Sequence, residues 1–128
     1  MRYKQYLSEQ KGFAPLVIQK LDEMSDRILD NLFNPQLTNI TIDKKGLVVG
    51  QVQSGKTANY TGLICKAADA GFNFIVVLAG ILNNLRSQTQ SRIDEGFLGF
   101  DTQYERAYNI NNTTKIGVGL IPGFDSAI

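Results

Sequence analysis

The sequence predicts an α/β fold in which an incomplete parallel-sheet core follows a helical segment. Two short, uniformly apolar runs, at residues 47–49 and 74–79, are each followed by a stretch of helical periodicity, and a glycine-rich turn joins the first run to its helix. The order strand, helix, strand, helix implies parallel strands joined by right-handed crossovers. We expect residues 1–45 to form a helical prelude and residues 46–128 to form the core.

The composition is that of a globular protein with one ordinary domain: 128 residues, 43% hydrophobic and 20% charged. A net charge of +1 gives no overall field toward nucleic acid or membrane. With Cys65 as the one cysteine and no histidine, an internal disulfide, a catalytic histidine base and zinc sites built from Cys and His are excluded. The polar start and the lack of a long apolar run predict a cytoplasmic protein without membrane contact.

Two helices are expected in the prelude. The first covers about Tyr3 to Gln10 and ends at Gly12, and the second begins at Pro15 and ends near Asn34-Pro35. Apolar side chains recur through the second at spacings of four and three: Val17, Leu21, Met24, Ile28 and Leu32.

In the core, the strand at residues 47–49 leads into a helix from Lys56 that Gly71 caps. The strand at residues 74–79 leads into a helix at about residues 82–95. Residues 115–123, KIGVGLIPG, are a third strand candidate that their glycines and proline weaken.

The turn between the first strand and its helix matches the phosphate-binding pattern GxxxxGK[ST] at every fixed position. The expected nucleotide site is Gly50, Gln51, Val52, Gln53, Ser54, Gly55, Lys56 and Thr57. The glycines allow backbone N–H groups to turn onto phosphate oxygens, and the helix start adds its positive dipole end. Lys56 is expected on the β- and γ-phosphates and the Thr57 hydroxyl on Mg²⁺, so ATP and Mg are the expected cofactors. The structural alternative is a solvated turn without a ligand.

The helix expected at residues 82–95 carries a polar surface with no acid before Asp94. Gln88 and Arg92 share a face, whereas Arg86 flanks the apolar stripe on its other side. Periodicity alone favours a solvated face, but the helix follows a strand, where ligands gather in open α/β sheets. For these three residues, contact with DNA phosphates therefore remains an alternative to a solvated surface.

The segments VVGQVQSGKTANYTGLICKAADAG and IVVLAGILNNLRSQTQSRIDEGF resemble the start of the Z-one domain family, whose members are described as candidate endonucleases. The resemblance covers about Gly46 to Gly99. It implies a P-loop NTPase core of the RecA-like kind, a branch of superfamily-two helicase ATPases found beside bacterial restriction and phage-defence genes. By position, Gly50 to Thr57 corresponds to the first helicase motif. Leu85, Arg86, Gln88 and Arg92 correspond to the segment that touches one DNA strand in related helicases.

The sequence also departs from a complete helicase. It shows no apolar strand ending in Asp-Glu, the motif that holds Mg²⁺ and activates water, since Asp94 and Glu95 follow a helix and Asp125 follows a proline and glycines. No group of Asp, Glu and Lys resembles a nuclease centre. We expect the front of a longer protein whose missing domains or partner subunits complete the ATPase, so whether this chain is an enzyme stays open.

The sequence leaves three candidate functions. The first is the ATP-binding N-terminal part of a helicase-like ATPase acting on DNA, in restriction or phage defence. The second is a non-catalytic, nucleotide-gated protein-interaction module. The third, a small phosphotransferase, is disfavoured because Arg106 is the one arginine after Gly96 that could serve a lid.

Overall fold

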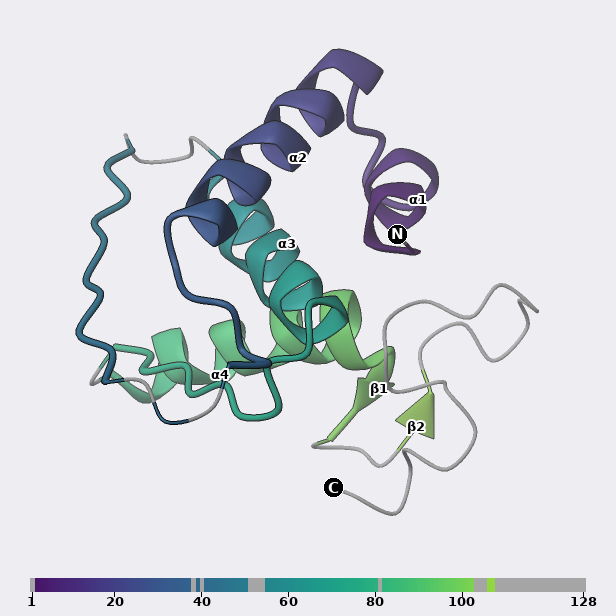
Figure 1. Cartoon of the computed structure of the whole chain (residues 1–128). Coiled ribbons are helices and arrows are strands. Elements are labelled where there is room, and N and C mark those ends of the chain that lie inside the picture. Colours follow the sequence, from purple (N-terminus) through teal and green to yellow (C-terminus); the bar gives the residue numbers. More distant parts are fainter. Residues whose placement is uncertain are drawn as a thin grey trace. The chain divides into compact units, whose positions relative to one another are not determined.

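The computed structural model describes residues 2–37, 39, 41–50, 55–80, 82–102 and 106–107. The chain divides into two compact units. One unit runs from Ala14 to Ile75, and the other comprises Met1–Phe13 with Val76–Ile128. Helices dominate the described part of both units (Figure 1).

The unit from Ala14 to Ile75 is built on two helices that pack against each other, α2 (Pro15–Asp30) and α3 (Lys56–Asp69) (Figure 1). Proline is well placed at the first turn of α2, where its missing N–H is not needed. The buried side chains of Ile18 on α2 and Ile64 on α3 belong to the core of this unit. Both predicted helices are confirmed, although α2 ends before the predicted Asn34-Pro35.

The end of α3 is a Schellman motif. Gly71 has a φ of 101°, the left-handed conformation that glycine adopts without steric cost. The N–H of Phe72 donates to the Ala67 carbonyl at 3.0 Å, and the N–H of Gly71 donates to the Ala68 carbonyl at 3.0 Å. The Phe72 ring packs edge-on against Phe33, with 5.1 Å between ring centroids. The predicted cap at Gly71 is confirmed.

The other unit contains two further α-helices, one turn of π-helix and two short strands. Their bounds are α1 (Arg2–Glu9), α4 (Asn83–Ile93), the π-helix η1 (Asp94–Leu98), β1 (Phe100–Asp101) and β2 (Arg106–Ala107). Tyr3, Tyr6 and Leu7 of α1 are buried, and α1 packs against η1. An ion pair of 2.9 Å between Lys11 Nζ and Glu95 Oε1 adds to this packing. The helices predicted at about Tyr3 to Gln10 and at about residues 82–95 are confirmed.

The predicted parallel-sheet core is wrong. The described residues contain one sheet, the antiparallel pair of β1 and β2, in which Phe100 lies opposite Ala107. The runs at residues 47–49 and 74–79 form neither helix nor strand. The P-loop NTPase core of RecA-like kind is therefore not the architecture of the described chain.

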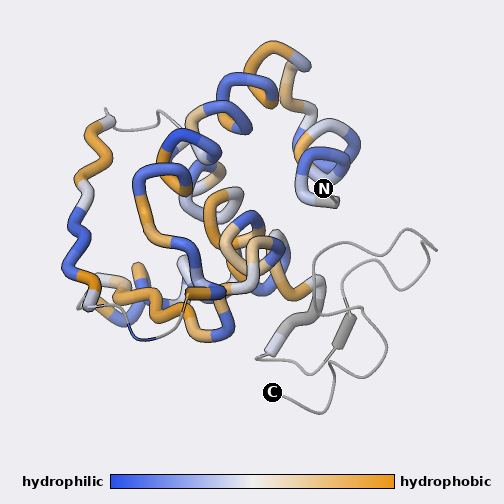
Figure 2. The backbone as a smooth tube through the Cα atoms, viewed as in Figure 1, coloured by the Kyte–Doolittle hydropathy of each residue, from blue (hydrophilic) through white to orange (hydrophobic). Residues whose placement is uncertain are grey.

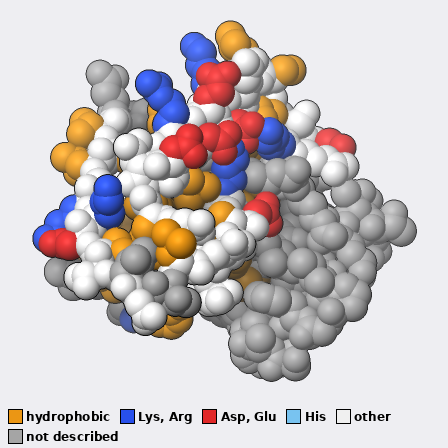
Figure 3. Space-filling model, viewed as in Figure 1, with side chains coloured by type: hydrophobic (Ala, Val, Ile, Leu, Met, Phe, Trp, Pro, Cys, Tyr) orange, Lys and Arg blue, Asp and Glu red, His pale blue; other side chains and the backbone are white. Residues whose placement is uncertain are grey.

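The two apolar runs lie largely in solvent. Leu47 is 88% exposed and Leu78 is 91% exposed. The orange tube over residues 47–49 marks the first run in Figure 2, and hydrophobic side chains reach the surface in Figure 3. A strand is stable only when neighbouring strands pair its N–H and C=O groups, and the described residues pair neither run in a sheet. The division between the units also falls inside the second run, after Ile75.

Some predictions are not tested by the described residues. The third strand candidate at residues 115–123 and Asp125 lie outside the described residues. The division of the chain at residue 45 stays a prediction. None of the helices in the described ranges combines the length and the apolar character needed to cross a bilayer.

Candidate phosphate-binding site

The site begins where helix α3 begins. Gly55 is the residue before the helix and has a φ of 77°, which places it in the left-handed region. A Cβ at this position would meet no atom within 4 Å. Glycine is therefore favoured here by the backbone conformation and not by lack of space.

The two ends of the GxxxxGKT motif are joined by a hydrogen bond. Lys56 is the first residue of α3, and its Nζ donates to the Gly50 carbonyl oxygen at 2.5 Å. The lysine is exposed, and Thr57 follows half-buried in the first helical turn. Gly50, Gly55, Lys56 and Thr57 are thus brought together at one end of α3.

The four central residues of the motif, Gln51, Val52, Gln53 and Ser54, lie outside the described residues. The backbone N–H groups of Gln53 and Ser54 were expected to turn onto the phosphates together with those of residues 55–57. That part of the expected cradle stays a prediction.

The electrostatics at this end of α3 suit an anion. The first turn holds no acidic residue, and the glycine at the N-cap has no side chain that could cap the helix. A helix N-terminus carries about half a positive charge, and Lys56 adds its ammonium group. Phosphate oxygens fit this environment, and a hydroxyl such as that of Thr57 is a suitable ligand for a hard cation.

Replacing Gly55 with alanine is expected to lower the free energy of unfolding by about 1–2 kcal/mol, because an L side chain disfavours a φ of 77°. Gly46 is the matched control, since a Cβ there also meets no atom within 4 Å and its φ is not left-handed. Gly46→Ala should change stability by less than about 0.5 kcal/mol. Urea unfolding of both variants makes the comparison, and equal losses would contradict the role given to the Gly55 backbone.

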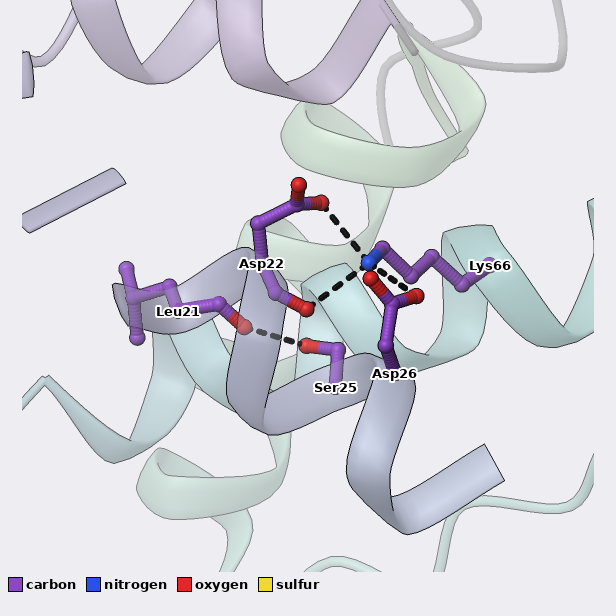
Figure 4. Close-up of polar contacts among 5 residues, drawn as sticks. All are labelled: Leu21, Asp22, Ser25, Asp26 and Lys66. Atoms are coloured by element: carbon purple, nitrogen blue, oxygen red, sulfur yellow. Dashed lines mark hydrogen bonds and ion pairs between the residues drawn. The ribbon is translucent and has the colours of Figure 1, made fainter. Parts of the chain in front are cut away.

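Helix α3 is attached to α2 by a largely buried lysine that the sequence analysis did not identify. Lys66 Nζ lies 2.7 Å from Asp22 Oδ1, donates to the Asp22 carbonyl oxygen at 2.8 Å and pairs with the Asp26 carboxylate (Figure 4). The Lys66 side chain is only 11% exposed. Burial lowers the pKa of Lys66, but the hydrogen bonds and charges of Asp22 and Asp26 outweigh burial and raise its pKa above the ordinary value. The available signal was the pair of aspartates four residues apart on one helix face.

Asn59 is a second buried contact between these helices. It is 6% exposed, and its Nδ2 donates to the Met24 sulfur at 2.9 Å. Its backbone N–H donates to the Gly55 carbonyl at 3.1 Å, which closes the first turn of α3. Asn59 was not predicted as a functional residue, since one asparagine in a helix carries no signal of burial.

The candidate DNA residues lie on α4, in the other unit. All three, Arg86, Gln88 and Arg92, are exposed, and α4 has no buried residue. Arg86 lines a cavity of about 340 Å³ together with Val77 and Thr89, and neither Gln88 nor Arg92 lines it. Arg86 therefore differs from Gln88 and Arg92 in its surroundings, and the role of all three in DNA contact stays a prediction.

The acids that end α4 are part of the local structure. Asp94 is 1% exposed and accepts hydrogen bonds from Gln90 Nε2 at 2.6 Å and from Thr102 N and Oγ1 at 2.9 and 2.6 Å. Glu95 pairs with Lys11. Among the described side chains, no group of three or more metal-binding residues occurs.

Cys65 is a packing residue in this structure. It is buried, and burial, followed by the nearby charge of Asp69, raises the pKa of the thiol to about 12. Nucleophilic cysteines have a lowered pKa, which favours the reactive thiolate. Cys65 is therefore not a candidate nucleophile.

Comparison of the chain with protein-family models, curated proteins and solved structures gives no match. The resemblance to the Z-one domain family stays a prediction.

Proposed function

We propose that the loop from Gly50 to Thr57 binds the phosphates of a nucleoside triphosphate, ATP in the first instance, together with Mg²⁺. The observation that carries the proposal is the hydrogen bond of 2.5 Å from Lys56 Nζ to the Gly50 carbonyl, beside a left-handed Gly55. It supports a site in which Gly50 lies beside the start of α3, next to a lysine ammonium. That arrangement gives a phosphate both a point charge and a helix N-terminus.

Each residue has a distinct role in this proposal. Gly55 gives the backbone the turn that starts α3, Lys56 neutralises phosphate charge, and Thr57 supplies its hydroxyl to the metal. Bound Mg²⁺ would neutralise charge on the phosphate oxygens. The proposal covers binding and not hydrolysis, because the sequence shows no apolar strand ending in Asp-Glu.

The proposal is tested by calorimetry with the wild-type chain. Mg²⁺-ATP and inorganic triphosphate with Mg²⁺ are expected to bind, whereas adenosine is expected not to bind, because the proposed contacts are made to phosphate. Binding of adenosine as strong as that of ATP, or no binding of triphosphate, would contradict the assignment.

On the resemblance to the Z-one domain family, we extend the proposal to the ATP-binding N-terminal part of a helicase-like ATPase that acts on DNA, in bacterial restriction or phage defence. Arg86, Gln88 and Arg92 are the proposed DNA contacts. Their exposure on α4 supports this role, since each is accessible to a phosphate backbone.

A nucleotide-gated protein-interaction module is the second candidate. It is favoured by the exposure of Leu82 (67%) and Leu85 (48%), two apolar side chains at the N-terminal end of α4. Apolar side chains exposed together suit a protein partner better than a phosphate backbone.

A DNA titration separates the two candidates. If DNA contact is correct, affinity for a short duplex falls by about tenfold or more between 50 and 200 mM salt, since phosphate contacts release counterions. Arg92→Gln should weaken binding and reduce this salt dependence, with exposed Arg27→Gln on α2 as the charge-matched control. Absence of DNA binding with ATP present would favour the interaction module.

A further inference from the structure

Helix α3 connects the candidate phosphate loop to α2. Its first residues, Lys56 and Thr57, belong to the loop. Asn59 and Lys66 lie seven residues apart, which is close to two helical turns, so they share one face of α3. Both contact α2, Asn59 at Met24 and Lys66 at its two aspartates.

These contacts define how α3 is oriented on α2. Apolar packing tolerates small rotations and shifts of a helix, whereas hydrogen bonds have a preferred distance and direction. Lys66 donates to the Asp22 carbonyl oxygen and the Asp26 carboxylate and forms an ion pair with the Asp22 carboxylate (Figure 4). Rotation of α3 about its axis would break these bonds and leave buried polar groups without their partners.

The same rotation would move the start of α3, which carries Lys56 and Thr57. Asn59 is one helical turn from Lys56, and its N–H bonds the carbonyl of Gly55. A helix of 14 residues transmits rotation along its length, because its backbone hydrogen bonds keep successive turns in register. The direction of the helix N-terminus toward a phosphate is therefore linked to the contacts made at Asn59 and Lys66.

We propose that Asn59 and Lys66 are positioning residues of the phosphate site, through which α2 holds the start of α3 in its binding orientation. The inference rests on the proposed function, since it assigns further residues to the same site. Neither residue touches the nucleotide. Coupling of this kind is reciprocal, so nucleotide binding also stabilises the contact between α2 and α3.

The experiment compares Lys66→Met with Lys20→Met, an exposed lysine of α2, by calorimetry with Mg²⁺-ATP. Circular dichroism sets a temperature at which both variants are folded. Lys66→Met is expected to raise the Kd by about fivefold or more, and Lys20→Met to leave it unchanged. Lys66→Arg, which keeps the charge and the donors, is expected to recover part of the lost affinity.

Hydrogen exchange supplies a readout that a purely structural role would not change. ATP is expected to slow exchange of the α2 amides in the wild-type chain and to have no such effect in Lys66→Met. If Lys66→Met does not fold, Asp26→Asn replaces it, because Asp26 is 58% exposed and its loss leaves the Asp22 contacts in place. That variant is expected to raise the Kd by about twofold.

The outcomes separate the two proposals. ATP binding by the wild-type chain, with the same Kd in a folded Lys66→Met or Asp26→Asn variant, would overturn the positioning role alone. Absence of ATP binding by the wild-type chain would overturn the phosphate site and the positioning role together.

Discussion

Lys56→Ala is expected to weaken Mg²⁺-ATP binding by about a hundredfold while the helices remain intact. A charge-assisted hydrogen bond contributes about 1.5–3 kcal/mol, and about 3 kcal/mol corresponds to a hundredfold change in Kd. The lysine is exposed and its contact with the Gly50 carbonyl lies at the surface, so the free energy of unfolding should change by less than about 0.5 kcal/mol. Calorimetry gives the affinity, and urea unfolding gives the stability.

Lys45→Ala is the matched control for this variant. Lys45 precedes the loop in the chain, its side chain is 87% exposed, and it pairs with Asp43 at 3.4 Å on the surface. The two variants lose the same charge, so a general electrostatic effect would lower affinity equally in both. If Lys56→Ala binds ATP with the same affinity as the wild type, Lys56 is not part of the site.

Lys66→Met is expected to lower the free energy of unfolding by about 2–3 kcal/mol. The methionine keeps most of the chain length but leaves the buried Asp22 Oδ1 without the ammonium that lies 2.7 Å away. Removing one member of a buried ion pair costs about 3–5 kcal/mol, and the exposure of Asp26 reduces that value here. Lys20→Met, on the exposed face of α2, should stay within about 0.5 kcal/mol of the wild type.

The contribution of Lys66 to the free energy of unfolding should also decrease at high pH. Its pKa is raised in the folded protein, so its stabilising effect is complete below the unfolded-state pKa of about 10.4 and is lost as pH rises through the folded-state value. The stability difference between the wild type and Lys66→Met should be constant from about pH 7 to 9 and should narrow above about pH 10.4. A difference that widens at high pH would contradict the ion pair.

The helices could be predicted from the sequence because their signals are local. Pro15 marks the start of α2, Gly71 caps α3, and apolar spacing of three and four indicates that each segment is helical. The spacing did not identify the buried face of α2, because Val17 and Met24 of the predicted stripe are exposed and Ile18 is buried. The sheet could not be predicted in this way. An apolar run such as residues 47–49 shows that a segment suits a strand, but the pairing that makes it one depends on residues far away in the chain.

The candidate site shows the same limit. The motif from Gly50 to Thr57 is contiguous, so its residue types and spacing identify it without knowledge of the fold. Lys66 and Asp22 are 44 residues apart, and nothing in the sequence shows that they meet. Asn59 likewise meets Met24 from 35 residues away. The contacts that orient α3 become visible only in the structure.

The most direct measurement of the central claim is the amide spectrum of the isotope-labelled chain during titration with Mg²⁺-ATP. The claim is that the loop ending in Lys56 and Thr57 binds the triphosphate. The largest chemical-shift changes are therefore expected at residues 50–57, with inorganic triphosphate reproducing them. Changes confined to other segments, or a spectrum that ATP leaves unaltered, would contradict the account.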